Sequence, residues 1–211
     1  MPARAFDWNV VVVGAWNLAI LTPQGIARRL FDLAPGLPIQ VQIAVDGTAP
    51  MRVTHNRVTV LPDVGSITVQ PAEQNVAALD SAAAIARRGM TSLPETPVAA
   101  AGVNFRFRFD ALPDSLIRAL YSSLDDRLAD AEQRTTGSAL TRTLRWRLDG
   151  VVNLELQQNE DAPGTLLFNY HRGSTSNADL IAWLGEVPAM HEHAMQLYHG
   201  VLELPNLGTE P

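Results

Sequence analysis

Residues 9–23 read NVVVVGAWNLAILTP, the longest apolar run in the chain. Val10–Val13 are four consecutive β-branched residues, which favour a strand because their stiff side chains pack well on a pleated surface. Both sides of this run are apolar, which predicts a strand that is covered on both faces and lies centrally in its sheet. Gly14 within the run predicts a bulge or bend. Thr22-Pro23 then supplies the cap and first residue of a helix.

The order of predicted elements is the same in two parts of the chain. Each part begins with a strand, continues with a helix and several short strands, and ends with another helix. The first half is expected at residues 1–92 and the second at residues 97–204, joined by the proline-rich link SLPETP. The two halves share a short stretch of similar sequence, VVVGAWN around Gly14 and AAAGVNF around Gly102. We therefore expect one internally duplicated domain over residues 1–211, with a frayed tail at 205–211.

Several local signals place the elements within these halves. In the first half, IQVQIAV (39–45) alternates, MRVTHNRVTVL (51–61) predicts a hairpin, and an alanine-rich helix is expected at 72–90 with Gly89 as its C-cap. In the second half, VAAAGVNFRFRFD (98–110) is a strand, 114–134 a long helix, and Asp149-Gly150 the turn of a hairpin. A helical segment follows residue 177, broken at Pro188.

These elements together predict the α+β class. The sheet is expected to be curved and mostly antiparallel, built from the two related halves, with helices on one face.

The composition excludes several kinds of catalytic group, cross-link and metal site. The chain has 211 residues, 46% hydrophobic and 18% charged, which is typical of a globular protein. It contains no cysteine and no lysine. Disulfides, thiolate nucleophiles, cysteine-bound zinc, lysine Schiff bases and a P-loop lysine are therefore excluded. No glycine-rich nucleotide motif follows a strand, so we expect no cofactor and no metal.

The formal net charge of −6 argues against nucleic acid and against an anionic membrane surface as partners, because both require a basic footprint. The longest apolar run is too short to span a bilayer, which needs about 20 residues, and the first residues lack the pattern of a signal peptide. We expect a cytoplasmic protein.

The most informative polar pattern lies in the second half. Alternation sets Arg106 and Arg108 opposite the phenylalanines of their strand, and Arg145 and Arg147 opposite the leucines of theirs, with His171 on the following strand. If these strands are neighbours, the five residues share one arginine-rich face, with Glu155 inside it. Guanidinium groups match carboxylates and phosphates, so this face is a candidate binding site for an acidic partner. The alternative is an ordinary solvated sheet face.

Other candidates are weaker. His191, His193 and His199 follow helical spacing without the H-E-x-x-H pattern of zinc enzymes, which favours surface or interface histidines over a metal site. No G-x-S-x-G nucleophile motif is present. The four tryptophans are interpreted as core residues.

Three sequence features together resemble a known group of proteins. They are G-A-W-N leading into I-L-T-P (14–23), the strand A-G-V-N-F-R-F (101–107) and the strand F-N-Y-H (168–171). This pattern resembles uncharacterised, sporadically distributed bacterial proteins with duplicated β-α-β units. The resemblance implies a sheet similar to TATA-binding-like or SecB-like folds; it implies no activity.

These observations favour a non-enzymatic binding protein whose partner is a protein or peptide, including a second copy of itself as a homodimer. One alternative is a carrier of a small hydrophobic ligand, held between the sheet and the 114–134 helix. A weaker alternative is an enzyme that uses His171 and the arginine-rich face.

Overall fold

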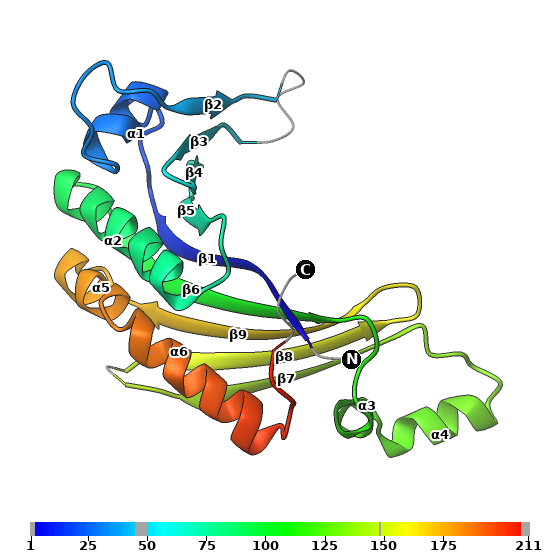
Figure 1. Cartoon of the computed structure of the whole chain (residues 1–211). Helices are drawn as coiled ribbons and strands as arrows, with labels where there is room; N and C mark the ends of the chain where they lie inside the picture. The colour runs from blue at the N-terminus through cyan, green and yellow to red at the C-terminus, as the bar shows by residue number, and fades with distance from the viewer. Residues whose placement is uncertain (1–2, 45–49, 148, 208–211) are drawn as a thin grey trace.

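The computed structural model describes residues 3–44, 50–147 and 149–207. The predicted α+β class is confirmed (Figure 1). The described strands form one antiparallel sheet in the order β2-β3-β4-β5-β1-β6-β9-β8-β7. Their bounds are β1 Arg4–Gly14, β2 Gln40–Gln42, β3 Arg52–His55, β4 Val58–Pro62, β5 Ser66–Pro71, β6 Val98–Phe109, β7 Gly137–Arg145, β8 Val151–Asn159 and β9 Gly164–Gly173.

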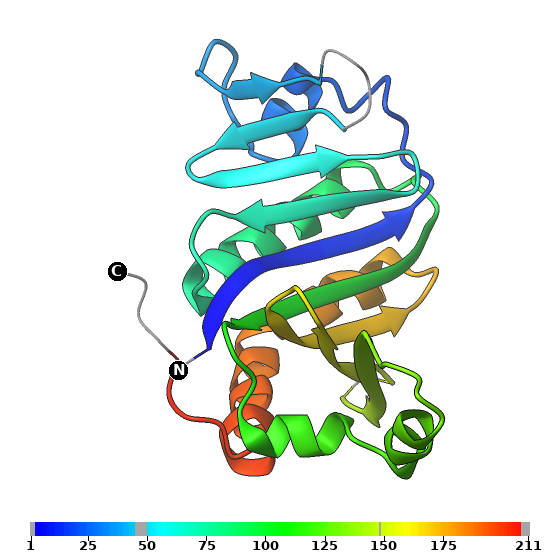
Figure 2. The same ribbon diagram turned by 90° about the vertical axis from the view of Figure 1, so that its right-hand side faces the viewer.

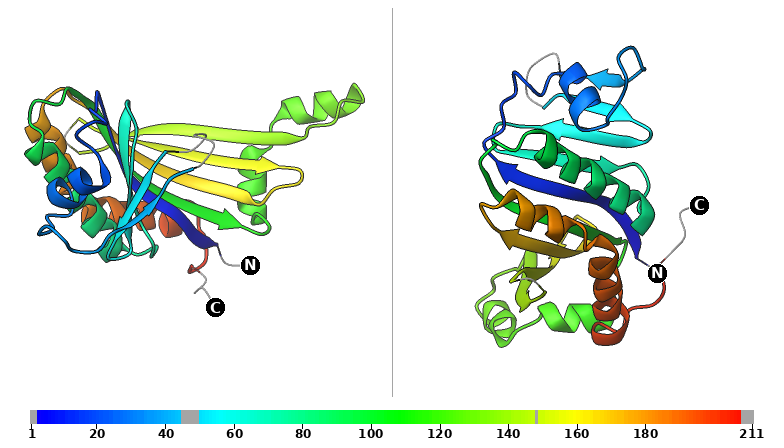
Figure 3. Two further views of the ribbon diagram at one scale, coloured as in Figure 1. Left: turned by 90° about the horizontal axis from the view of Figure 1, so that it is seen from above. Right: turned by 90° about the vertical axis from the view of Figure 1, so that its left-hand side faces the viewer.

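Helices pack against one face of this sheet and leave the other face open (Figures 1 and 3). α2 lies against β5 and β1, α5 and α6 lie against β6, and α3 reaches β7 and β8. The helices are α1 Pro23–Arg29, α2 Val76–Ser92, α3 Asp114–Leu120, α4 Ser123–Asp130, α5 Asn177–Leu184 and α6 Val187–Gln196, followed by the π-helical turn η1 Leu197–Val201. The predicted break near Pro188 is confirmed, since Pro188 lies in the first turn of α6.

The central position predicted for the first strand is confirmed, because β1 lies between β5 and β6. The register of β1 with β6 shifts between Val13 and Gly14, as expected from the glycine. Thr22 caps α1 by accepting a hydrogen bond from the Gly25 amide. The prediction that both faces of this strand are covered is wrong: Val13 points to the open face and is 40% exposed.

The strand order is similar on the two sides of the β1–β6 pair. Outward from β1 come β5, β4, β3 and the short edge strand β2, and outward from β6 come β9, β8 and β7. In each half the first strand therefore pairs with the last one. This is the arrangement that a duplication requires, while the duplication itself stays a prediction.

Both predicted hairpins are present. Asn56 and Arg57 have φ values of +46° and +64° and join β3 to β4, as in a type I′ turn. Asp149 has a φ of +57° in the turn between β7 and β8. Val45, Leu148 and the tail beyond residue 207, for which predictions were also made, lie outside the described residues.

Two predictions about helices are wrong. The helix expected over 114–134 ends at Leu120 and restarts at Ser123, because Ser122 and Asp125 form a capping box that starts a second helix. Gly89 does not cap α2, which continues to Ser92. Gly89 instead lies against Leu30, where an added Cβ would come within 3.3 Å of the leucine Cγ.

The core beneath the sheet is rich in aromatic rings. Trp8 packs edge-on against Phe105 and Phe107, with centroid distances of 5.1 and 5.9 Å. At the far end, Trp146 packs edge-on against Trp183 at 5.1 Å. Edge-to-face pairs stabilise a core beyond the burial of their area. The assignment of the tryptophans to the core is thus supported for Trp8, Trp16 and Trp183, which are buried.

Substitution of Gly150 tests how closely the β7–β8 turn packs against Trp183. A Cβ added there would lie 2.0 Å from Trp183 Cη2, so Gly150→Ala forces the buried indole to move. We expect a loss of about 1–3 kcal/mol in the free energy of unfolding, measured by urea denaturation. Gly65→Ala is the matched control, since no atom lies within 4 Å of its added Cβ. Equal stabilities for the two variants would contradict this packing.

Candidate functional site

The open face of the sheet is the broadest surface that the helices leave free, and Figure 2 shows it with α2 and α5 behind. On β6, β8 and β9 this face is largely polar, whereas β1 also presents Val11 and Val13 on it. Cross-strand pairing aligns its residues in rows, one of which joins Asn9, Asn104, Asn169 and Asn153. The adjacent row joins Phe6, Arg106, Leu167 and Glu155. β6, β9, β8 and β7 are neighbours in this order, which is the condition that the arginine-rich face required.

A bulge in β1 shapes this face. The pairing with β6 passes from Phe6↔Arg106 to Asn9↔Asn104, so β1 has one more residue than β6 in this interval. Asp7 takes the extra length with a φ of +49°, a conformation that aspartate tolerates better than most residues. Bulges redirect side chains. Here Trp8 enters the core, while Phe6 and Asp7 both line a hollow on the open face.

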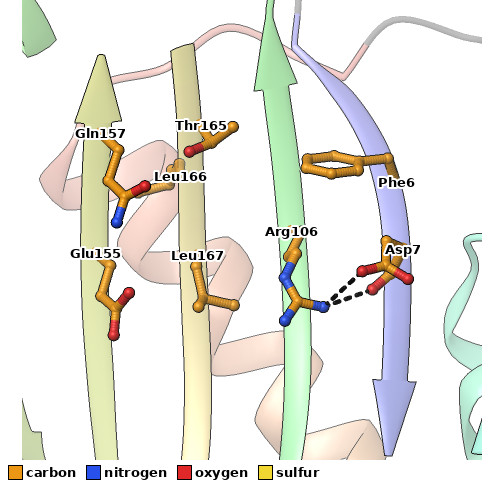
Figure 4. A pocket seen from close by; sticks show the side chains of 8 residues that line it. All are labelled: Phe6, Asp7, Arg106, Glu155, Gln157, Thr165, Leu166 and Leu167. Atoms are coloured by element: carbon orange, nitrogen blue, oxygen red, sulfur yellow. Dashed lines mark hydrogen bonds and ion pairs between the residues drawn. The ribbon is translucent and has the colours of Figure 1, made fainter. Parts of the chain in front are cut away.

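Arg106 is held by this bulge. Its Nη1 donates to the backbone oxygen and to the Oδ2 atom of Asp7, each at 2.9 Å (Figure 4). The other carboxylate oxygen of Asp7 accepts a hydrogen bond from Gln70 at 2.6 Å. The Arg106 side chain is 29% exposed. The positive charge of Arg106 is thus already matched within the fold.

Glu155 lies across the same hollow, on β8. Arg106, Glu155, Gln157, Thr165 and Leu167 line it together with Phe6, Asp7 and Leu166, around a volume of about 380 Å³ (Figure 4). Among the described residues, no ion pair or hydrogen bond reaches the Glu155 carboxylate. The carboxylate of Glu155 is therefore the unmatched charge of this hollow.

A row of side-chain hydrogen bonds crosses the sheet next to the hollow. Thr143 donates to Asn153 at 2.8 Å, Asn153 to Asn169 at 3.1 Å, Asn169 to Asn104 at 2.8 Å and Asn104 to Asn9 at 2.8 Å. Asn9 ends the row by donating to the backbone oxygen of Asp7 at 3.0 Å. All these bonds run in one direction, so each polarises the next. We call these five side chains the carboxamide row.

The carboxamide row fixes the register of the sheet. Asn9 and Asn104 are 6% and 7% exposed, and a one-residue slip of either strand would leave their amides without partners. A buried polar group without a hydrogen bond costs about 1–3 kcal/mol. The row therefore joins β1, β6, β9, β8 and β7 in one alignment.

The other predicted site residues are distributed over this face. Arg108 is exposed, with its guanidinium carbon 5.6 Å from the centroid of the Phe6 ring. His171 pairs with Gly102, on the other side of the carboxamide row from Arg106. Gly102 and Arg106 are four residues apart along β6, about 13 Å at the usual rise of a strand. Arg145 ends β7 in the same cross-strand row as His171. The structure thus does not gather the five residues into one site.

Arg147 lies elsewhere, and the prediction that it shares the open face is wrong. β7 ends at Arg145, so the alternation ends before Arg147. Its guanidinium lies 3.6 Å from Glu186 and stacks near Trp146. Arg145, Trp146 and Arg147 instead line a second, polar hollow of about 400 Å³ with Glu192, His193 and Gln196 of α6.

The two histidines of α6 pack against aromatic side chains of the core, and His193 also lines the second hollow. His193 Nδ1 is hydrogen-bonded to the Tyr170 hydroxyl at 2.8 Å. Burial lowers the pKa of His193, with a further contribution from the positive charge of Arg147. Burial also lowers the pKa of His191, which packs against Trp8 and Phe105, and raises the pKa of Tyr170. In the described part of the chain, no cluster of three acidic or histidine side chains is placed to hold a metal ion.

An apolar hollow lies at the opposite end of the sheet. It has a volume of about 560 Å³ between α1 and the segment that leads to β2, and its lining includes Ala27, Leu33, Leu37 and Ile39. The carrier alternative expected a pocket beside a 114–134 helix. There, Leu116 of α3 is buried on the sheet, and no residue of α4 is buried. The carrier alternative stays a prediction, and this apolar hollow does not lie where that alternative expected its pocket.

Comparison with known proteins adds no assignment. No known family model matches the chain, and no curated protein matches its sequence. Within residues 3–44, 50–147 and 149–207, none of the helices has the length and apolar character needed to cross a membrane.

Sequence reasoning missed Asp7 and Asn9, which hold Arg106 and end the carboxamide row. The only local signal was the polar pair Asp7 and Asn9 beside Trp8, at the start of an otherwise apolar strand. Alternation alone cannot reveal a bulge, because one extra residue reverses the faces of all that follows.

The carboxamide row leads to a stability prediction. Asn104→Ala removes one acceptor and one donor and leaves Asn9 and Asn169 each with an unmet bond. We expect a loss of about 1–3 kcal/mol in the free energy of unfolding. Thr143→Val is the control, since it removes only the exposed end of the row and should cost less than about 1 kcal/mol. Urea denaturation at neutral pH measures both, and equal losses would rule out a shared, buried row.

Proposed function

We propose that the protein binds an extended polypeptide segment on the open face of its sheet and catalyses no reaction. The observation that carries the proposal is the hollow beside Arg106, where Glu155 presents a carboxylate that no described residue pairs with. Its volume of about 380 Å³ lies within the range of about 300–1,000 Å³ that is usual for binding pockets.

The charges of the hollow favour a basic side chain. Arg106 is neutralised by Asp7, so the arginine that suggested an acidic partner is occupied. The Glu155 carboxylate is not neutralised by a described residue, and Phe6 and Leu167 supply apolar surface beside it. Arginine and lysine side chains match this combination, because their stems cover apolar surface while their charged ends reach a carboxylate.

The carboxamide row favours a polypeptide over a compact small molecule. Each asparagine has two N–H donors and two acceptor sites, and the row uses one donor and one acceptor of most of them. Asn9 and Asn104 are buried, but Asn153 and Asn169 are half-buried, so their remaining groups lie side by side on β8 and β9 within reach of a partner. A peptide backbone offers alternating N–H and C=O groups to such a pair.

The proposal gives the two halves of the chain different roles. We infer that they arose by duplication and that the second half diverged to bind. This is supported by the matching strand order on the two sides of the β1–β6 pair and by the open face, where β1 carries Val11 and Val13 while β6 carries Asn104, Arg106 and Arg108. The resemblance to duplicated bacterial proteins agrees with it and stays a prediction.

The test is selection from a random dodecapeptide phage library on the immobilised full chain. We expect enrichment of peptides with arginine or lysine. Fluorescence anisotropy of the best peptide should then show binding at least about tenfold weaker to Glu155→Gln, since a hydrogen bond to a charged group contributes about 1.5–3 kcal/mol.

Glu95→Gln is the matched control, because Glu95 is exposed in the turn before β6, away from the hollow. It should bind like the wild type. Selection of acidic peptides, or equal affinity of Glu155→Gln and the wild type, would show that Glu155 is not the recognition group.

A further inference from the structure

The outer edge of β7 is the longest free backbone edge of the sheet. β7 runs from Gly137 to Arg145 and pairs with β8 on one side, and no described strand pairs with its other side. The opposite edge strand, β2, has three residues. Proteins usually protect long edges with charged side chains, proline, bulges or short strands. β7 has no proline, its register with β8 is unbroken along its whole length, and Arg142 and Arg145 are its only charged side chains.

One backbone hydrogen bond shows which backbone groups of β7 point outward. The Trp146 amide donates to the Gly150 oxygen at 2.9 Å, in the same register as the rest of the hairpin. In an antiparallel pair, alternate residues direct both N–H and C=O to the neighbouring strand. Even-numbered residues of β7 therefore bond to β8. The odd-numbered residues Gly137, Ala139, Thr141, Thr143 and Arg145 direct both groups away from the sheet. Among them, the Thr141 oxygen accepts a hydrogen bond from Nη1 of the exposed Arg142 side chain at 2.9 Å, and this side chain moves aside when another strand pairs here.

We propose that β7 pairs with β7 of a second copy of the chain, antiparallel and about a two-fold axis at Thr141. This register joins the outward groups of both strands, because odd-numbered residues then face odd-numbered residues. Thr141 faces Thr141 of the second copy, Ala139 faces Thr143, and Gly137 faces Arg145. No two arginines are directly opposite, so like charges do not oppose the pairing.

The arm formed by α3 and α4 favours a second copy as the occupant. It lies beside the start of β7, on the side of the free edge (Figures 1 and 2). No residue of α4 is buried, and Ile117, Tyr121 and Leu124 of the arm are 50%, 56% and 54% exposed. A helix of eight residues is not stable alone in water. The apolar side of α4 is therefore expected to pack against something outside its own chain.

Antiparallel pairing brings the arm of one copy close to the Arg145 end of β7 in the other copy. It sets the Gly137 end of one β7 beside the Arg145 end of the other, where Arg145, Trp146 and Arg147 line the second hollow. The arm is acidic there, with Asp125, Asp126 and Asp130 on α4. Arg145 has no ion pair with any described residue. The negative charge and the apolar surface of the arm thus complement this end of β7. This proposal does not depend on the peptide site around Glu155.

The lack of cysteine in the chain makes a single introduced thiol a specific probe. Facing side chains of an antiparallel pair have Cβ atoms about 4.5–5.5 Å apart, with the longer values in hydrogen-bonded pairs, which exceeds the Cβ separation of about 3.5–4.5 Å that a disulfide needs. A short bismaleimide spans this gap. Each of its two carbon–carbon double bonds adds one Thr141→Cys thiol, with no leaving group, so the two chains should join as a covalent dimer. Thr143→Cys faces Ala139 and should stay monomeric on a non-reducing gel. Failure of Thr141→Cys to cross-link, or equal cross-linking of Thr143→Cys, overturns the proposal.

A second pair of variants tests the backbone bonds. Thr141→Pro removes an outward N–H without touching the bonds to β8, and edge strands tolerate proline in that orientation. Thr141→Ala keeps the N–H. By light scattering, the wild type and Thr141→Ala should have twice the chain mass of 22.9 kDa, and Thr141→Pro, folded by circular dichroism, should have the single mass. A monomeric wild type, or a folded Thr141→Pro that stays dimeric, overturns the proposal.

Discussion

The pairing of β1 with β6 is the interaction on which the rest of the structure depends. It is the one junction in the described sheet between the strands of the first half and those of the second. On the helical side, Val10 and Val103 meet as buried neighbours, and on the open side Asn104 donates to Asn9. The apolar contacts supply burial, and the carboxamide bond selects one register, since a slip by one residue exchanges the two faces. Without this pair, α2 of the first half would not meet α5 and α6 of the second half over one sheet.

The one-sided covering of the sheet follows from the sequence of its strands. Phe105, Phe107 and Phe109 of β6 alternate with Asn104, Arg106 and Arg108, so only one face needs a layer of helices. The polar face is stable without a cover because its groups bond to one another. Asn9 and Asn104 are the only polar residues in the described core, and both lie in the carboxamide row. The surface proposed for binding is thus also a part of what aligns the sheet.

Local patterns predicted much of this fold. β-branched residues at Val10–Val13, the Thr22-Pro23 helix start, and the turns at Asn56-Arg57 and Asp149-Gly150 depend on neighbouring residues alone, and all are present. The break after Leu120 was missed because the leucine spacing continued through a capping box that starts a new helix. Gly89 looked like a helix end, although it is the point where α2 passes Leu30. A close approach between distant segments leaves no local signal.

The site was predicted only in part. Alternation placed Arg106 and Glu155 on one face, and pairing confirmed it. The charge balance depended on Asp7, which reaches Arg106 through a bulge that local sequence does not reveal. The most direct test of the central claim is a titration of the ¹⁵N-labelled full chain, followed by NMR, with N-acetyl-arginine methylamide and, separately, N-acetyl-glutamate methylamide. The account predicts saturable shifts at the amides of Arg106, Glu155 and Leu167 with the arginine compound and none with the glutamate compound. Shifts confined to the helices, or a response to the glutamate compound alone, would contradict it.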